Sequence, residues 1–77
     1  MNDKTPAQFI REDVFCIGNQ KDFGALIDYS QAQISRFESG ARKLSRGAQE
    51  RIRAAARRRR IKWDDRWFFE VPVERAS

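Results

Sequence analysis

Helix-start signals recur at short intervals along the chain, and they constrain its fold more than any other feature. Residues that favour helix N-caps precede four segments with apolar residues at helical spacing, namely Thr5, Asn19, Ser30 and Ser45. Thr5 and Ser30 each have a glutamine three positions later, which is the pattern of a capping box. The sequence therefore predicts a mostly α-helical fold, a compact bundle of four to five short helices.

Residues that end helices or turn the chain set the bounds of the predicted helices. These helices cover about 6–18, 20–27, 31–38 and a segment that begins after Ser45. Gly40 can take the left-handed backbone that ends the third helix. Cys16 falls inside the first helix, where we interpret it as a small buried core residue.

Cys16 is the only cysteine among the 77 residues, and the chain contains no histidine. A disulfide within the chain and a zinc site with the usual nitrogen and sulfur ligands are therefore both excluded. The missing histidine also removes the usual base of nucleophilic catalysis. A chain of this length forms one small domain, whose stability must come from an apolar core. We expect no enzymatic activity, no metal or other cofactor and no small-molecule ligand.

The net charge of +5 is concentrated in the middle of the chain. Residues 36–62 carry eleven basic and two acidic side chains, residues 1–35 carry three and five, and residues 63–77 carry two and four. A basic centre of this kind indicates a polyanionic partner, with nucleic acid ahead of an anionic membrane surface. We interpret the run Arg57 to Arg60 as a solvated helix end that suits the helix dipole and adds long-range attraction.

The pattern changes after residue 62. Residues 63–73 combine aromatic and β-branched residues with Pro72, which disfavours a helix. They predict a turn followed by an extended segment, with a strand as one interpretation. We therefore expect a flexible N-terminus at 1–4, a helical domain at 5–62, an aromatic C-terminal extension at 63–73 and a loose tail at 74–77.

The segment from Gln20 to Gly40 reads QKDFGALIDYSQAQISRFESG. Over about residues 19–45 the chain resembles, without a gap, the helix-turn-helix motif of the Cro and phage-repressor-like (XRE-type) DNA-binding family. The family's core positions, its small residue, its turn plug and its Glu-x-Gly exit are matched by Phe23, Gly24, Ile27, Tyr29, Ile34, Phe37, Glu38 and Gly40. The resemblance implies a lambda-repressor-like fold whose recognition helix, about residues 30–38, enters the major groove.

Two positions depart from the family pattern. Asp28 stands where glycine is usual in the turn, and aspartate tolerates a left-handed backbone less well than glycine. Leu26 stands where the family has a polar residue, which indicates a contact with the aromatic tail or with a second subunit.

The register of the resemblance implies roles for individual side chains. The candidates for reading bases are Gln31, Ala32, Gln33 and Arg36. Arg36 suits the guanine edge, Gln31 the adenine edge and Ala32 the thymine methyl group. Gln33 has a second interpretation as the capping-box partner of Ser30. The candidates for phosphate contacts are Gln20, Ser30, Arg42, Lys43 and Arg46, and Gln20 would also brace the recognition helix.

A single domain of this size reads few base pairs, so we expect a homodimer on double-stranded DNA. The candidate dimer interface is Trp63, Trp67, Phe68, Phe69 and Val71, with 67–71 as a strand that pairs across the two-fold axis. In the other interpretation, Trp67 and Phe69 fold back onto the helices of their own domain.

The expected function is a sequence-specific transcriptional regulator that acts as a repressor. One alternative is an antitoxin or adaptor-type protein-interaction module with secondary DNA binding, and another is a nucleic-acid-coating protein that uses the arginine run. No apolar run approaches the roughly 18–20 residues of a membrane span, and the N-terminus lacks a signal pattern. We therefore expect a cytoplasmic location and no membrane partner.

Overall fold

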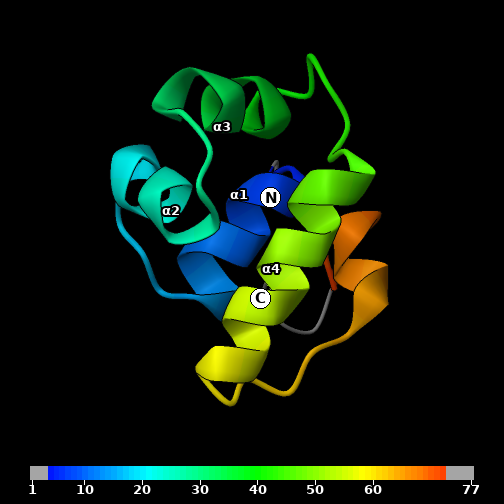
Figure 1. The fold of residues 1–77 in the computed structure, drawn as a ribbon. Coiled ribbons are helices and arrows are strands. Elements are labelled where there is room, and N and C mark those ends of the chain that lie inside the picture. The colour runs from blue at the N-terminus through cyan, green and yellow to red at the C-terminus, as the bar shows by residue number, and fades with distance from the viewer. Residues whose placement is uncertain (1–3, 73–77) are drawn as a thin grey trace.

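The computed structural model describes residues 4–72, which form helices and contain no strand (Figure 1). The elements are α1 (Pro6–Phe9), η1 (Ile10–Val14), α2 (Gln20–Ile27), α3 (Gln31–Glu38), α4 (Arg46–Arg58) and η2 (Asp65–Phe68). η1 is a π-helical continuation of α1, and η2 is a 3-10 turn. The prediction of a compact, mostly α-helical fold is confirmed. No helix in this part of the chain is long and apolar enough to cross a membrane.

The first helix ends earlier than predicted, at Val14. The chain turns at Cys16, whose backbone is left-handed with φ of 57°, and the amide of Ile17 then donates to the carbonyl of Arg11 at 2.9 Å. The turn leaves Cys16 exposed, so the prediction of a buried helical cysteine is wrong.

The predicted cap of the first helix is confirmed in part. Thr5 Oγ1 accepts a hydrogen bond from the amide of Gln8 at 3.3 Å. The Gln8 side chain does not return to Thr5 as a capping box requires, because its Nε2 donates to Glu12 at 3.0 Å.

The turn between α2 and α3 has an aspartate at its left-handed position. Asp28 takes the left-handed conformation, with φ of 62° and ψ of 45°. The amide of Tyr29 closes the end of α2 by donating to the carbonyl of Gly24 at 2.8 Å. A Cβ atom at Gly24 would lie 2.4 Å from the carbonyl oxygen of Tyr29, so the close crossing of α2 and the turn requires glycine there.

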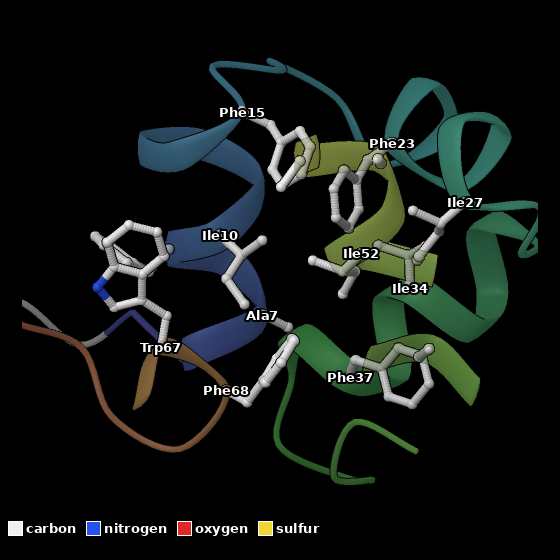
Figure 2. Packing of buried hydrophobic residues seen from close by; sticks show 14 residues of the cluster. Ala7, Ile10, Phe15, Phe23, Ile27, Ile34, Phe37, Ile52, Trp67 and Phe68 are labelled. Atoms are coloured by element: carbon white, nitrogen blue, oxygen red, sulfur yellow. The ribbon is translucent and has the colours of Figure 1, made fainter. Parts of the chain in front are cut away.

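The core lies where the first helix, α2, α3 and α4 meet (Figures 1 and 2). Its largest fully buried side chains are Phe9, Ile10, Phe23, Ile27, Ile34 and Ile52. The rings of Phe15 and Phe23 pack edge to face with centroids 5.5 Å apart. The apolar spacing in all four helical segments therefore serves a single core.

The aromatic C-terminal segment completes this core, and it forms the short helix η2 in place of the strand that was one interpretation of it. Asp64 caps the short helix η2 by accepting from the amide of Arg66 at 2.9 Å. η2 turns Trp67 and Phe68 inward, where they are 8% and 5% exposed. The Trp67 ring packs edge to face on Phe9 with centroids 5.9 Å apart. The predicted tail at 74–77 and most of the predicted flexible N-terminus lie outside the described residues.

Candidate nucleic-acid interface

α3 presents one buried and one exposed side. Ile34 and Phe37 are buried against the core. The predicted base-reading residues are all exposed, and they occupy the first turn and the outer side of the helix: Gln31, Ala32, Gln33 and Arg36. Figure 1 shows α3 at one edge of the molecule, where a large partner can approach it.

A complete capping box fixes the N-terminus of α3. Ser30 Oγ accepts from the amide of Gln33 at 3.1 Å, and Gln33 Oε1 accepts from the amide of Ser30 at 2.9 Å. The interpretation of Gln33 as the capping partner is therefore confirmed. Because its side-chain oxygen is engaged in the box, Gln33 is less suited to reading a base than Gln31 or Arg36.

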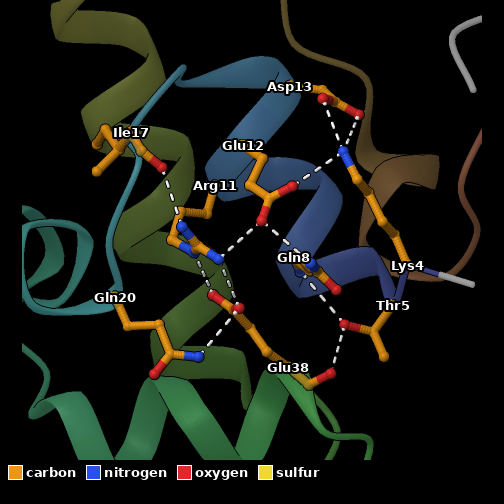
Figure 3. Close-up of polar contacts among 9 residues, drawn as sticks. All are labelled: Lys4, Thr5, Gln8, Arg11, Glu12, Asp13, Ile17, Gln20 and Glu38. Carbon is orange, nitrogen blue, oxygen red and sulfur yellow. Dashed lines mark hydrogen bonds and ion pairs between the residues drawn. The ribbon is translucent and has the colours of Figure 1, made fainter.

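Glu38 fixes the C-terminus of α3 to the first helix and to α2 (Figure 3). Its carboxylate accepts from Arg11 Nε at 2.6 Å, from Arg11 Nη2 at 3.0 Å and from Gln20 Nε2 at 3.2 Å. Its backbone carbonyl accepts from Thr5 Oγ1 at 2.8 Å. Hydrogen bonding to Glu38 raises the pKa of Arg11 above its ordinary value. The ion pair is almost fully buried, with the two side chains 6% and 7% exposed.

Gln20 performs one of its two predicted roles in the structure. Its contact with Glu38 braces the end of α3 against the start of α2. The phosphate contact predicted for Gln20 stays a prediction.

The residues predicted to contact phosphates surround α3. Arg42 and Lys43 lie in the loop after α3, and Arg46 lies in the first turn of α4. All three are exposed, as is the cap Ser30. Within residues 4–72 their charged groups form no ion pair.

Two cations in the middle of α4 are paired, unlike those next to α3. Arg51 pairs with Asp28 at 3.0 Å, and Arg53 pairs with Asp65 at 2.9 Å. The Arg53 contact lowers the pKa of Asp65 below its ordinary value. The unpaired basic groups next to α3 thus form a positive margin around its exposed side.

Two contacts that hold this region together were not predicted from the sequence. The first is the Arg11–Glu38 pair, although a signal existed, because Arg11 stands between apolar residues on the inward side of the first helix. The second is Arg51, whose Nη1 donates to the carbonyls of Ile27 and Asp28 at 3.2 and 3.3 Å. No local pattern indicates that a residue of α4 will hold the turn between α2 and α3.

The residues predicted for a dimer interface separate into two groups. Trp67 and Phe68 are buried in their own domain, and Trp63 packs on Trp67 with ring centroids 5.0 Å apart. Phe69 is 74% exposed, and Val71 is half-buried. Phe69 borders a pocket of about 400 Å³ whose other walls come from α1, α3, the following loop, α4 and η2: Thr5, Pro6, Ala7, Phe37, Gly40, Arg42, Lys43, Leu44, Gln49 and Phe68.

Comparison of the chain with protein-family models, curated proteins and solved structures found no match.

Proposed function

We propose that this chain is a sequence-specific, double-stranded DNA-binding transcriptional regulator with α3 as its recognition helix. The observation that carries the proposal is how α3 is exposed on one side and held at both ends. Its exposed side bears Gln31, Ala32 and Arg36, its two ends are held by hydrogen bonds, and unpaired cations flank it. A helix held in this way meets the major groove with little loss of conformational entropy. The resemblance of residues 19–45 to the Cro and phage-repressor-like family supports the same role.

The contacts divide into two classes. Arg36 reads a guanine edge, and Gln31 and Ala32 read neighbouring bases from the first turn of α3. Ser30, Arg42, Lys43 and Arg46 contact phosphates and fix the register of α3 on the duplex. Such a protein acts in the cytoplasm and represses by occupying its site.

A second copy of the chain completes the regulator. Within residues 4–72, Phe69 is the one large apolar side chain that is exposed, and it lines the pocket described above. A two-fold interface uses the same patch on both protomers, so a protruding ring beside a pocket suits self-association. The same feature supports the alternative of an antitoxin or adaptor module whose pocket takes a different protein.

Selection from a randomised pool of duplex DNA at physiological salt tests the proposal. We expect enrichment of a palindrome whose half-sites lie about 34 Å apart, one helical turn. Sedimentation equilibrium of the protein alone separates the two interpretations of the pocket, because the regulator is expected to dimerise and an adaptor is expected to stay monomeric. Absence of any enriched motif would reject sequence-specific binding.

A charge substitution at the edge of the interface provides a second readout. Lys43→Ala is expected to weaken binding to the selected site and to random DNA by similar factors. It is also expected to reduce the slope of log K against log salt by about 1. An unchanged slope would remove Lys43 from the phosphate contacts.

A further inference from the structure

A second basic surface lies at the end of α4. We call it the distal cluster, and it consists of Arg57, Arg58, Arg59, Arg60 and Lys62. All five residues are exposed, and in the described part of the chain none forms an ion pair. The nearest acids along the chain, Asp64 and Asp65, are already paired with Arg66 and Arg53. The cluster therefore keeps its full positive charge.

Helix stability does not account for this much charge. A helix C-terminus carries the equivalent of about half a negative charge, which one or two cations satisfy. Arg60 also occupies a position that disfavours arginine. Its backbone is left-handed with φ of 57°, and the amides of Arg60 and Ile61 donate to the carbonyls of Arg57 and Ala56 at 3.1 and 2.9 Å. Helices that end in this way prefer glycine at that position, so Arg60 supplies charge where stability alone favours glycine.

The end of α4 that carries the distal cluster lies at the opposite end of the molecule from the candidate recognition helix (Figure 1). In Figure 1, α3 lies at the top of the molecule and the yellow C-terminal end of α4 lies at the bottom. The molecule measures 30 × 28 × 23 Å. A duplex held by α3 therefore leaves the distal cluster exposed to another ligand.

We propose that the distal cluster binds the phosphate backbone of a second DNA duplex, so that one protein molecule bridges two duplexes. The proposal rests on the proposed function for the first duplex. Clustered arginines bind phosphates through electrostatic, sequence-independent contacts. Repulsion between the two duplexes is weak, because the protein that separates them is wider than the Debye length of about 8 Å at physiological salt.

An anionic membrane fits the distal cluster less well than DNA does. Helices that lie on membranes combine a basic face with an apolar face that enters the lipid. The apolar side of α4 is used in the core, where Ile52, Ala55 and Ala56 are at most 1% exposed. Phosphate recognition without insertion is the chemistry that remains.

A two-duplex capture assay tests the bridge. One duplex carrying the selected site is fixed to beads, the protein is added, and retention of a second, fluorescent duplex of random sequence is measured. The distal variant combines Arg57→Gln, Arg58→Gln, Arg60→Gln and Lys62→Gln, and keeps Arg59, which lies over the Phe15 ring at 5.9 Å. We expect this variant to bind the first duplex and to lose at least tenfold in capture of the second.

A matched control changes the other surface. The face variant combines Arg36→Gln, Arg42→Gln and Lys43→Gln, and it is expected to lose binding to the fixed duplex. If the distal variant captures the second duplex as well as the wild type does, the bridging proposal is overturned and the role of α3 is unaffected. If instead the face variant binds the fixed duplex normally, the proposed function fails, whereas the distal variant still reports on the cluster.

Arg60→Gly separates charge from folding. Because glycine suits the left-handed position, this variant is expected to melt at a higher temperature than the wild type and still to capture less of the second duplex. Unchanged capture would show that Arg60 is not part of a duplex site. Loss of binding to phosphatidylglycerol vesicles in the distal variant, with duplex capture intact, would assign the cluster to membranes and reject the DNA bridge.

Discussion

Glu38 connects three parts of the molecule through one side chain and one carbonyl group. Arg11 and Gln20 donate to its carboxylate, and Thr5 donates to its carbonyl (Figure 3). A buried ion pair gives little net stability compared with well-packed apolar residues, but losing one partner leaves an uncompensated charge in the core. The pair therefore makes the position of the end of α3 sensitive to a single substitution.

Glu38→Ala is expected to destabilise the protein by about 3–5 kcal/mol, because the buried Arg11 guanidinium loses its two hydrogen bonds to Glu38 and keeps the more exposed Glu12 and the Ile17 carbonyl as partners. Urea unfolding followed by circular dichroism measures the change. The control is Glu12→Gln, which removes a more exposed carboxylate beside the same arginine and is expected to cost about 1 kcal/mol or less. Equal losses for the two variants would contradict a special role for Glu38.

Acid is expected to weaken the fold through carboxylates whose pKa is lowered. Hydrogen bonds from Gln8 and then Lys4 hold the pKa of Glu12 below its ordinary value of 4.5. Hydrogen bonds from Arg66 likewise lower the pKa of Asp64. These groups bind protons more readily in the unfolded chain, so their contribution is present above pH 4.5 and is lost as the pH falls through the folded pKa.

Thermal unfolding between neutral pH and about pH 3 checks this dependence. The melting temperature of the wild type is expected to fall on acidification, and that of Glu12→Gln is expected to fall by less. An identical fall in the two proteins would show that Glu12 does not contribute to the pH dependence.

At the scale of the helices, the turn between α2 and α3 shows how an unusual residue is accommodated. Asp28 takes the left-handed backbone, and Arg51 from α4 holds its carbonyl and its carboxylate. Gly24 provides the space for the Tyr29 carbonyl. Glycine is therefore required at Gly24, where α2 packs against the turn, and not at the left-handed position of the turn itself.

Gly24→Ala is expected to destabilise the protein by about 1–3 kcal/mol, because the added methyl group meets backbone that cannot move alone. Gly18→Ala is the matched control. Its added methyl group would have no atom within 4 Å, and a change within about 0.5 kcal/mol is expected. Chemical denaturation of both variants compares them, and a neutral Gly24→Ala would contradict the close crossing.

Local signals predicted the helices well, and non-local contacts limited the rest. The caps Asn19, Ser30 and Ser45 act within their own first turn, so their roles could be read from spacing alone. The inward turn at η2 depends on a residue far away in the chain, the Phe9 ring that receives Trp67. The spacing of apolar residues in α3 predicted which side of the helix is exposed. It did not predict the buried ion pair with Arg11 that holds the end of the helix.

At the scale of the whole molecule, the aromatic segment belongs to the folded domain. Trp67→Ala is expected to cost about 3–5 kcal/mol, because a buried ring that packs on Phe9 is removed. Phe69→Ala is expected to change the free energy of unfolding by about 0.5 kcal/mol or less and to weaken self-association. Denaturant unfolding and sedimentation equilibrium of both variants measure the two effects. Self-association lost in Trp67→Ala but kept in Phe69→Ala would contradict this division.

The molecule has two basic surfaces at opposite ends, with different expected roles. The cations around α3 lie next to exposed side chains that can read bases. Within residues 57–62 the distal cluster has no such side chains beside it. The first surface predicts sequence preference, and the second predicts only salt-dependent attraction.

Parallel selection from randomised duplex DNA with the wild type and with Arg36→Ala tests the central claim, that α3 reads the major groove, most directly. The wild type is expected to enrich a palindromic motif, and Arg36→Ala is expected to enrich the same motif with one relaxed base pair in each half-site. On the wild-type site, this variant is expected to lose about 1–3 kcal/mol of binding free energy. Identical motifs from the two proteins, or equal losses on the selected site and on random DNA, would contradict α3 as the recognition helix.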